Sequence, residues 1–341
     1  GGVGGAVVAP LSPTWQSYFR NKDSKYQIIA APGMEAMALR IVEQHPGRFL
    51  YHETQWGKFP DGTDNIMLGG FQPVNHIAGE HVLMLATFTN NSTTLTQLTV
   101  MVTLLQSFVE SLTVVLPFYP VGTMTTVIKE GQVATANTYA QMFSNLPSCG
   151  KPTRLVIYDL HTLQNRFYLH GNAIASLQTS VPLLLDRLSR LSPAAPRITC
   201  VAFPDDGAAK RFGYMFKNLQ VEVVTCGRSR NGEPRVSIQD GEPRGRVCVV
   251  IDDLAQTGST LYQCGMALKA AGATSVSAFV VHAVFPNDSW RPFLRGGARD
   301  CFDRFYVTNS IPSVTDALPP GDVFEVLDLS AKIVEDLDKF S

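Results

Sequence analysis

The sequence predicts an α/β protein built from mainly parallel sheets that are flanked by helices. Short apolar runs alternate with segments of helical periodicity along most of the 341 residues, and this alternation is typical of βαβ units. Apolar residues make up 45% of the chain, which is enough to give two domains a core each. An internal repeat also favours two related halves.

The expected elements follow one another in a regular order. We predict strands at His81–Leu85, Leu112–Pro117, Arg154–Tyr158, Ile198–Phe203, Val221–Thr225, Val247–Ile251 and Val276–Val284. Helical patterns cover Thr94–Glu110, Gln132–Ser144, Ala173–Leu191, Ala208–Lys217 and Ser259–Ala271. Gly272 stands where a C-cap glycine is expected, Ser192–Pro196 is expected to be a surface loop, and Val323–Phe340 is expected to form a last strand and helix.

The repeat appears when the sequence is shifted by 166 residues without a gap. The shift places His81–Leu85 on Val247–Ile251, and strands fall on strands and helices on helices. Identity between the halves is low and βαβ units are common, so a chance match is the alternative. If the repeat is real, the acidic pair Asp252-Asp253 falls on Ala86-Thr87, and only the second half carries it.

Composition and charge exclude several classes of protein. The formal net charge is −1, from 28 basic and 29 acidic residues, so a general nucleic-acid binder is not expected. The apolar runs are too short to span a bilayer, and the glycine-rich start does not resemble a signal peptide. The six cysteines form no C-x-x-C pair, which favours reduced thiols over disulfides or zinc. We therefore predict a soluble, cytoplasmic protein that binds neither nucleic acid nor membrane.

The segment Val247–Thr260 carries the clearest chemical signal in the chain. An apolar strand ends at two aspartates, and ligands of open α/β sheets bind beyond such strand ends. The turn that follows opens a helix, whose free N–H groups and dipole attract phosphate, while vicinal sugar hydroxyls suit paired carboxylates. The alternative is an ordinary helix N-cap in an acidic, solvated loop. The candidate residues are Asp252, Asp253, Gln256, Thr257, Gly258, Ser259 and Thr260.

This segment resembles the phosphoribosyl-pyrophosphate (PRPP) loop of type I phosphoribosyltransferases and ribose-phosphate pyrophosphokinases. The resemblance implies that the two aspartates hold the ribose 2- and 3-hydroxyls and that Gln256–Thr260 holds the 5-phosphate. It also implies two similar type I phosphoribosyltransferase-like domains. Residues 24–178 would form an ATP-binding domain with a degenerate phosphate loop, joined by the C-terminal helix 326–341, and residues 179–325 would carry the PRPP loop.

The phrases Phe203–Ala208, Val133–Ala136 and Val284–Trp290 resemble the class II, plant-type branch of the pyrophosphokinases. Three further segments resemble the pyrophosphokinases in general. Trp56–Gly62 resembles a Phe-x-Asp-Gly element for adenine, Asp159–Gln164 an Asp-Leu-His element, and Phe203–Arg211 a Pro-Asp-x-Gly-x-Ala-Lys-Arg run. Core packing, a helix cap or a solvated helix face would explain each segment singly. The resemblance implies ATP binding by Phe59, Asp61, Thr63 and Gln164, and Mg²⁺ binding by His161, Asp205 and Asp159.

Cys226–Arg235 aligns with the catalytic flexible loop of this family. The family's Lys-x-Arg reads Arg228-Ser229-Arg230 here, and arginine for lysine changes the geometry of phosphate binding. An exposed hairpin loop with solubilising charges is the alternative. By the resemblance, Arg228, Arg230 and His161 are the expected catalytic residues.

The implied activity is that of a ribose-phosphate diphosphokinase, a kinase-type transferase. With Mg²⁺ it would transfer the pyrophosphoryl group of ATP to the anomeric hydroxyl of ribose 5-phosphate, giving PRPP and AMP for nucleotide biosynthesis. A homo-oligomer is expected. The alternatives are a non-catalytic or regulatory homologue, which Arg228 favours, and a type I phosphoribosyltransferase.

Overall fold

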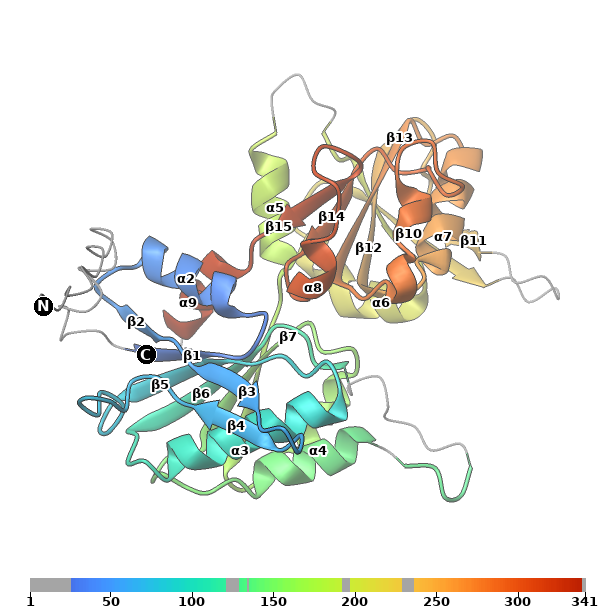
Figure 1. Ribbon diagram of the computed structural model, residues 1–341. Coiled ribbons are helices and arrows are strands. Elements are labelled where there is room, and N and C mark those ends of the chain that lie inside the picture. Colours follow the sequence, from blue (N-terminus) through green and yellow to red (C-terminus); the bar gives the residue numbers. More distant parts are fainter. Residues whose placement is uncertain (1–25, 121–128, 134, 192–196, 229–235, 339–341) are drawn as a thin grey trace, which may run out of the picture. The chain divides into compact units, whose positions relative to one another are not determined.

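The computed structural model describes residues 26–120, 129–133, 135–191, 197–228 and 236–338 (Figure 1). The chain divides into two compact units. The first contains Gly1–Leu116, Asn137–Val156 and Arg166–Ser176, and the second contains Pro117–Ala136, Ile157–Asn165 and Leu177–Ser341, each as far as it is described. In the described ranges, no helix has both the length and the apolar character needed to cross a membrane.

The first unit is built on a six-stranded sheet in the order β2-β1-β5-β6-β7-β8. Its strands are β1 (Tyr26–Ala30), β2 (Phe49–His52), β5 (His81–Leu85), β6 (Ser111–Leu116), β7 (Thr153–Tyr158) and β8 (Ala173–Gln178). The helices are α2 (Glu35–Gln44), α3 (Asn91–Leu105) and α4 (Thr135–Ser144), with a 3-10 helix, η2, at Leu163–Tyr168. The strand pairs β2-β1, β1-β5 and β5-β6 are parallel.

Packing of the first unit follows the apolar patterns of its elements. All five residues of β1 are buried, as expected for a strand covered on both faces. α3 and α4 lie side by side in Figure 1, and Tyr139 of α4 donates to Asn91 of α3 at 2.6 Å. The antiparallel hairpin of β3 (Gln55–Lys58) and β4 (Asp64–Met67) forms a separate two-stranded sheet, and Nε1 of Trp56 in β3 donates to the carbonyl of Ala30 in β1 at 3.0 Å. Thr96 of α3 holds the hairpin through a 2.5 Å hydrogen bond to Asp64.

The second unit is built on a seven-stranded sheet in the order β11-β10-β9-β12-β13-β14-β15. Its strands are β9 (Cys200–Phe203), β10 (Glu222–Arg228), β11 (Val236–Asp240), β12 (Val247–Ala255), β13 (Ser275–Ala283), β14 (Phe305–Thr308) and β15 (Phe324–Leu327). All neighbours are parallel except β10 and β11. The helices are α5 (Val181–Ser189), α6 (Asp206–Phe212), α7 (Ser259–Ala270), α8 (Pro312–Thr315) and α9 (Ser330–Asp338), with 3-10 helices η3 (Gly213–Phe216), η4 (Pro286–Asp288) and η5 (Arg291–Phe293).

Both faces of this second sheet are buried, which explains why its strands are apolar without alternation. Cys248 and Val250 of β12 pack in a core that includes Leu261 of α7. Val249 and Ile251 of the same strand pack on the opposite face in a core that includes residues of α5 and α6. The six cysteines are free thiols, as predicted.

The two sheets share one strand order once β11 is set aside. β5 lies between β1 and β6, and β12 lies between β9 and β13. This correspondence agrees with the 166-residue shift and confirms the predicted fold of two similar α/β halves. The domain limits 24–178 and 179–325 stay predictions, as does the return of 326–341 to the first domain. Contacts group α9 with the second unit.

Most predicted elements exist, and one is wrong. His81–Leu85 is confirmed without change, and Val247–Ile251 extends through the acidic pair to Ala255. The single helix predicted over Ala173–Leu191 is instead β8 followed by α5, because the first six residues pair in the sheet and Pro182 starts a new helix. Gly272 has φ +93°, as a C-terminal glycine requires, whereas Ser192–Pro196 lies outside the described residues.

Candidate active site

The candidate site lies at the carboxyl edge of the second sheet, where β12 ends. The apolar part of β12 fixes the strand in the core and carries Asp252 and Asp253 to this edge. Asp253 is buried, and Asp252 is half-buried. The backbone N–H of Asp253 donates to Oδ1 of Asp252 at 2.9 Å, which fixes the first carboxylate against the strand.

Three sequence segments meet at Asp253. His161, from the loop after β7, places Nδ1 2.6 Å from Oδ2 of Asp253. Arg211, from the last turn of α6, donates Nη1 to the same oxygen at 2.9 Å and to the carbonyl of His161 at 3.2 Å. Nη2 of Arg211 is buried and has no hydrogen-bond partner among the described residues. One carboxylate oxygen therefore joins all three segments, and one buried guanidinium nitrogen has no partner among the described residues.

The charges in this cluster shift one another's titration. Burial alone would raise the pKa of Asp253, but the hydrogen bond from His161 and the charge of Arg211 hold its pKa below the usual range. The same hydrogen bond raises the pKa of His161. Burial and the neighbouring negative charge of Asp253 raise the pKa of Asp252 well above its usual range. The pair therefore consists of one stable anion and one carboxyl group that readily takes a proton.

A cavity of about 540 Å³ opens beside this cluster, within the size range of small-molecule sites. Both aspartates line it, together with His161 and with residues of the segment that enters α6. Asp205 also lines the cavity, while its Oδ1 accepts from the N–H of Ala208 at 2.9 Å and so caps α6. Lys210 and Arg211 add positive charge to the wall. The cavity thus combines carboxylates with cations, as a site for a metal and phosphates requires.

The turn that follows β12 leaves its backbone donors free. α7 begins after Gly258, which has φ +66°, and no described side chain caps the helix. Within the described part of the chain, the N–H groups of Thr257–Leu261 make no hydrogen bond. A Cβ at Gly258 would lie 2.5 Å from Cζ of Phe293, so glycine is needed both for its φ and for space. Successive free N–H groups at a helix start form an anion site.

The comparisons with known proteins agree with this geometry. Searching protein-family models returns no match. The chain is 41% identical over 308 residues to ribose-phosphate pyrophosphokinase 4 of Oryza sativa subsp. japonica, which covers 89% of this chain and 92% of the relative. It is also 41% identical over 337 residues to the chloroplastic ribose-phosphate pyrophosphokinase 3 of the same plant, which covers 97% and 80%. The chain belongs to the ribose-phosphate pyrophosphokinase family.

A solved structure supports the same fold. The phosphoribosylpyrophosphate synthetase of Mycobacterium smegmatis superposes with a TM-score of 0.73, covering 93% of this chain and 99% of that chain at 20% identity. The family resemblance expected from the PRPP loop is confirmed. The expected similarity to the plant-type branch is confirmed as well, because the 41%-identical relatives are plant ribose-phosphate pyrophosphokinases.

The structure gives Asp159, an expected metal ligand of this pyrophosphokinase, a different environment. Its carboxylate is buried and accepts hydrogen bonds from Oγ1 of Thr179 at 2.8 Å and from N and Oγ of Ser180 at 2.7 and 2.8 Å. Asp159 itself has φ +41°. Three donors at the start of α5 use its oxygens, and it does not line the cavity with His161 and Asp205. The geometry gives its assignment as a metal ligand no support.

Three of the four expected ATP residues lie together in one hairpin turn. Phe59, Asp61 and Thr63 lie in the turn of the β3–β4 hairpin, where Oδ1 of Asp61 accepts from N and Oγ1 of Thr63 at 3.0 and 2.6 Å. Phe59 is 51% exposed, so packing in its own hairpin does not explain this aromatic ring. Gln164 lies in η2, and its side chain is outside the described part.

The expected catalytic arginines lie at the limit of what the structure describes. The backbone of Arg228 ends β10 and pairs with Val236. Its side chain and all of Arg230 are outside the described residues. The sequence did not reveal that Arg211 joins His161 to Asp253. The feature of the sequence that could have indicated Arg211 is the Lys-Arg pair at the end of the Phe203–Arg211 segment. This pair would equally suit a solvated helix face.

Proposed function

We propose that this chain is a ribose-phosphate diphosphokinase. It transfers the pyrophosphoryl group of ATP to the anomeric hydroxyl of ribose 5-phosphate and forms PRPP and AMP for nucleotide biosynthesis. The observation that carries the proposal is the acidic pair at the end of β12, followed directly by an uncapped helix start, in a member of this family.

The sugar phosphate has a natural orientation in this arrangement. The free N–H groups and hydroxyls of the turn receive the 5-phosphate, and the acidic pair receives the 2- and 3-hydroxyls. Oδ2 of Asp253 is occupied by His161 and Arg211, so Oδ1 is the oxygen left for the ribose. The low pKa of Asp253 supports this role, because an ionised carboxylate is the stronger acceptor.

The residues of the cavity fit magnesium. Mg²⁺ in phosphoryl-transfer sites takes one or two carboxylates and completes its shell with phosphate oxygens and water. Asp205 lines the cavity and would supply such a carboxylate. Nδ1 of His161 bonds Asp253, so Nε2 is the ring nitrogen that would bind the ion. These two residues would hold the ion, and Asp159 is the less suitable third candidate. When bound, Mg²⁺ neutralises charge on the transferring phosphate oxygens.

Positively charged side chains would position the phosphate groups of the two substrates. Arg211 and Lys210 line the cavity from α6, and Arg228 and Arg230 are the residues we propose to close over the phosphates. Such transfer needs alignment and charge neutralisation more than covalent catalysis. We propose Phe59, Asp61, Thr63 and Gln164 for ATP, and a homo-oligomeric assembly. A cytoplasmic location stays a prediction, since relatives include a chloroplastic enzyme from rice and a mitochondrial one from spinach.

One assay tests the function. The protein is incubated with ATP, Mg²⁺ and ribose 5-phosphate, and AMP and PRPP are quantified by chromatography. We expect both products in equal amounts, and neither when ribose 5-phosphate is left out. Binding of ribose 5-phosphate without AMP formation would instead indicate a non-catalytic homologue. Consumption of added PRPP that depends on a nucleobase would indicate a phosphoribosyltransferase.

A further inference from the structure

Two donors from one neighbouring segment hold the carbonyl oxygens of the phosphate turn. Oγ of Ser289 donates to the carbonyl of Gln256 at 3.1 Å, and Nη1 of Arg299 donates to the carbonyl of Thr257 at 2.7 Å. Neither donor belongs to the turn or to α7, the helix that follows it. Both come from the stretch between β13 and β14, about 30 to 40 residues further along the chain.

Holding these carbonyls also sets the direction of the N–H groups. In a trans peptide the C=O and the following N–H point to opposite sides of the same plane. The N–H of Thr257 therefore points away from Ser289, and the N–H of Gly258 points away from Arg299. The N–H groups of Thr257 and Gly258 thus point away from the supporting segment. The two carbonyl oxygens that would repel a phosphate point toward this segment and accept its hydrogen bonds.

The supporting segment is itself held firmly. The N–H groups of Val284 and Phe285 both donate to the carbonyl of Ala255, at 3.0 and 3.1 Å. The backbone N–H of Arg299 donates to the carbonyl of Pro292 at 2.8 Å. Its guanidinium lies 5.8 Å from the centre of the Phe293 ring and 5.9 Å from that of Tyr262, within cation–π distance of both. The side chain is thereby fixed on the back of the turn.

Backbone strain marks the same segment. Phe285, Asn287 and Asp288 have φ of +35°, +54° and +56°, although none is glycine. Such conformations cost roughly 1–3 kcal/mol each and persist where the surroundings impose them, often at functional sites. Here the strained residues begin at Phe285, which donates to Ala255, and end at Asp288, next to Ser289.

We propose that Arg299 and Ser289 are positioning residues of the phosphate turn, which hold the Gln256 and Thr257 carbonyls so that the N–H groups of Thr257 and Gly258 face the 5-phosphate. This inference rests on the proposed function. The charge of Arg299, placed behind the turn, adds attraction for the phosphate dianion without direct contact.

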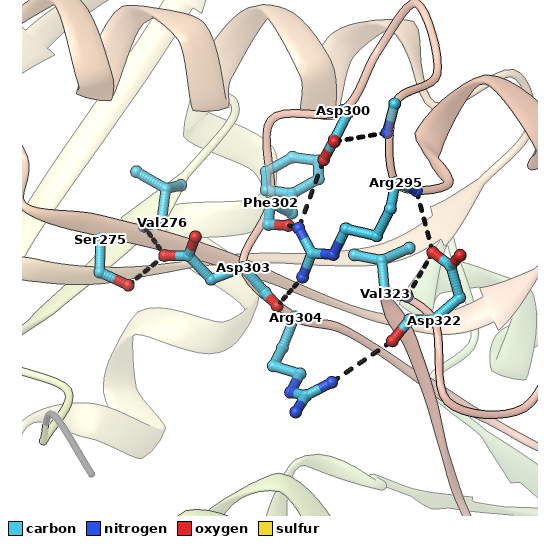
Figure 2. Close-up of polar contacts among 10 residues, drawn as sticks. Ser275, Val276, Arg295, Asp300, Phe302, Asp303, Arg304, Asp322 and Val323 are labelled. Atoms are coloured by element: carbon cyan, nitrogen blue, oxygen red, sulfur yellow. Dashed lines mark hydrogen bonds and ion pairs between the residues drawn. The ribbon is translucent and has the colours of Figure 1, made fainter.

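Arg295 offers a matched control. It lies on the same segment but at the amino edge of the sheet (Figure 2). Its Nη1 donates to the carbonyl of Phe302 at 2.8 Å and reaches Asp300 at 3.3 Å, and its backbone N–H donates to Asp322 at 3.0 Å. Its loss removes an equal charge and at least as many hydrogen bonds, but none that touches the phosphate turn.

The experiment compares Arg299→Met, Arg299→Lys, Ser289→Ala and Arg295→Met with the wild type. Ribose 5-phosphate is titrated into each protein by calorimetry without ATP, and KM and kcat are then measured for both substrates. For Arg299→Met we expect the Kd and KM for ribose 5-phosphate to rise about tenfold, the loss typical of a charge-assisted hydrogen bond. The kcat and the KM for ATP should stay unchanged. The Kd for ribose 5-phosphate of Arg299→Lys should lie between those of Arg299→Met and the wild type, and that of Ser289→Ala should rise about threefold.

The outcomes separate the two proposals. If the wild type does not bind ribose 5-phosphate, the proposed function itself fails. If it binds and Arg299→Met binds equally well, or if Arg295→Met weakens binding as much, the positioning role is overturned. A purely structural role would lower Tm and kcat in Arg299→Met and leave KM unchanged. Should Arg299→Met fail to fold, unchanged affinity in both Arg299→Lys and Ser289→Ala overturns the inference.

Discussion

The turns after β5 and β12 occupy the same place in two sheets of the same strand order, yet their polar groups are used in opposite ways. In the first unit, Oε1 of Gln97 accepts from the N–H of Thr87 at 2.9 Å, and Nε2 donates to the carbonyl of Thr87 at 2.5 Å. Oδ1 of Asn90 caps α3 by accepting from the N–H of Thr93 at 3.0 Å, and Oγ1 of Thr93 accepts from the N–H of Asn90 at 3.2 Å.

In the second unit the backbone N–H groups at the start of α7 have no side-chain partner among the described residues. No described side chain caps α7, the turn carries Gly258, and the acidic pair stands where the first unit has Ala86-Thr87. The carbonyls are bound from behind by Ser289 and Arg299, which leaves the N–H side for a ligand. The proposed binding site therefore differs from the first turn because its helix start has no cap among the described residues, on a fold that both halves share.

Removing the acidic pair should have the largest effect. In Asp252→Asn/Asp253→Asn, ribose 5-phosphate loses the ionised carboxylate of Asp253 and the carboxyl acceptor of Asp252, and its Kd should rise by roughly a hundredfold or more. Calorimetric titration measures this. Asp252→Asn alone leaves the contacts of Asp253 with His161 and Arg211 in place and should retain the fold. Asp300→Asn, at the amino edge, is the control and should bind normally. Wild-type affinity in the double variant would refute the assignment of the pair.

Lowering the pH should destabilise both units through buried histidines. Burial lowers the pKa of His52 in the first unit and of His282 in the second to about 4. Because the unfolded pKa is about 6.5, the unfolded state binds more protons between these values, so stability is full above pH 6.5 and falls toward pH 4. The loss between pH 7 and pH 5 should be roughly 2 kcal/mol for each histidine. Urea unfolding at pH 7 and pH 5 measures it, and a smaller loss in His52→Gln and His282→Gln is expected.

Adding a side chain at Gly258, in the turn of the second unit, should also lower the free energy of unfolding. Gly258→Ala puts a methyl group 2.5 Å from Phe293 at φ +66°, so we expect roughly 2–3 kcal/mol of destabilisation and weaker ribose 5-phosphate binding. Gly321→Ala is the control, since Gly321 has φ +80° but nothing within 4 Å of its Cβ position. It should lose about 1 kcal/mol. Equal losses in the two variants, measured by urea unfolding, would mean that crowding at Gly258 plays no part.

Removing the side-chain hydrogen bonds of the turn in the first unit should lower stability and leave the binding of ribose 5-phosphate unchanged. Gln97 is buried, so Gln97→Leu leaves Thr87 with an unpaired N–H and C=O, at a cost of about 2 kcal/mol. Asn90→Ala removes the cap of α3 and should cost about 1 kcal/mol. In both variants the KM for ribose 5-phosphate should match the wild type. An increase in that KM would show that the two turns are not functionally separate.

The sequence predicted the central fold because its strongest patterns are local. An apolar run, two aspartates and a glycine turn before a helix define β12 and α7 without outside information. The boundary between β8 and α5 was missed because the sheet partner of β8 is distant in sequence, and pairing in the sheet outweighed helical periodicity. The β3–β4 hairpin was missed because its strands are short and mostly exposed.

The site was predicted only in part, for the same reason. Each motif that meets at Asp253 was found, but His161 lies 92 positions away from it and Arg211 lies 42 positions away. Convergence over such distances depends on the strand order. Asp159 was expected to bind a metal only because the Asp159–Gln164 segment resembles the family's Asp-Leu-His element. Its hydrogen bonds to Thr179 and Ser180 could be foreseen only once α5 is known to begin there.

A crystal structure with ribose 5-phosphate bound tests the central claim most directly. The contrast between the two turns predicts that the phosphate lies within hydrogen-bond distance of the N–H groups of Thr257–Thr260, with the ribose hydroxyls at Asp252 and Asp253. No phosphate should lie at the turn between Ala86 and Asn90. A ligand bound elsewhere in the second unit, with the N–H groups after β12 still unbound, would contradict the claim.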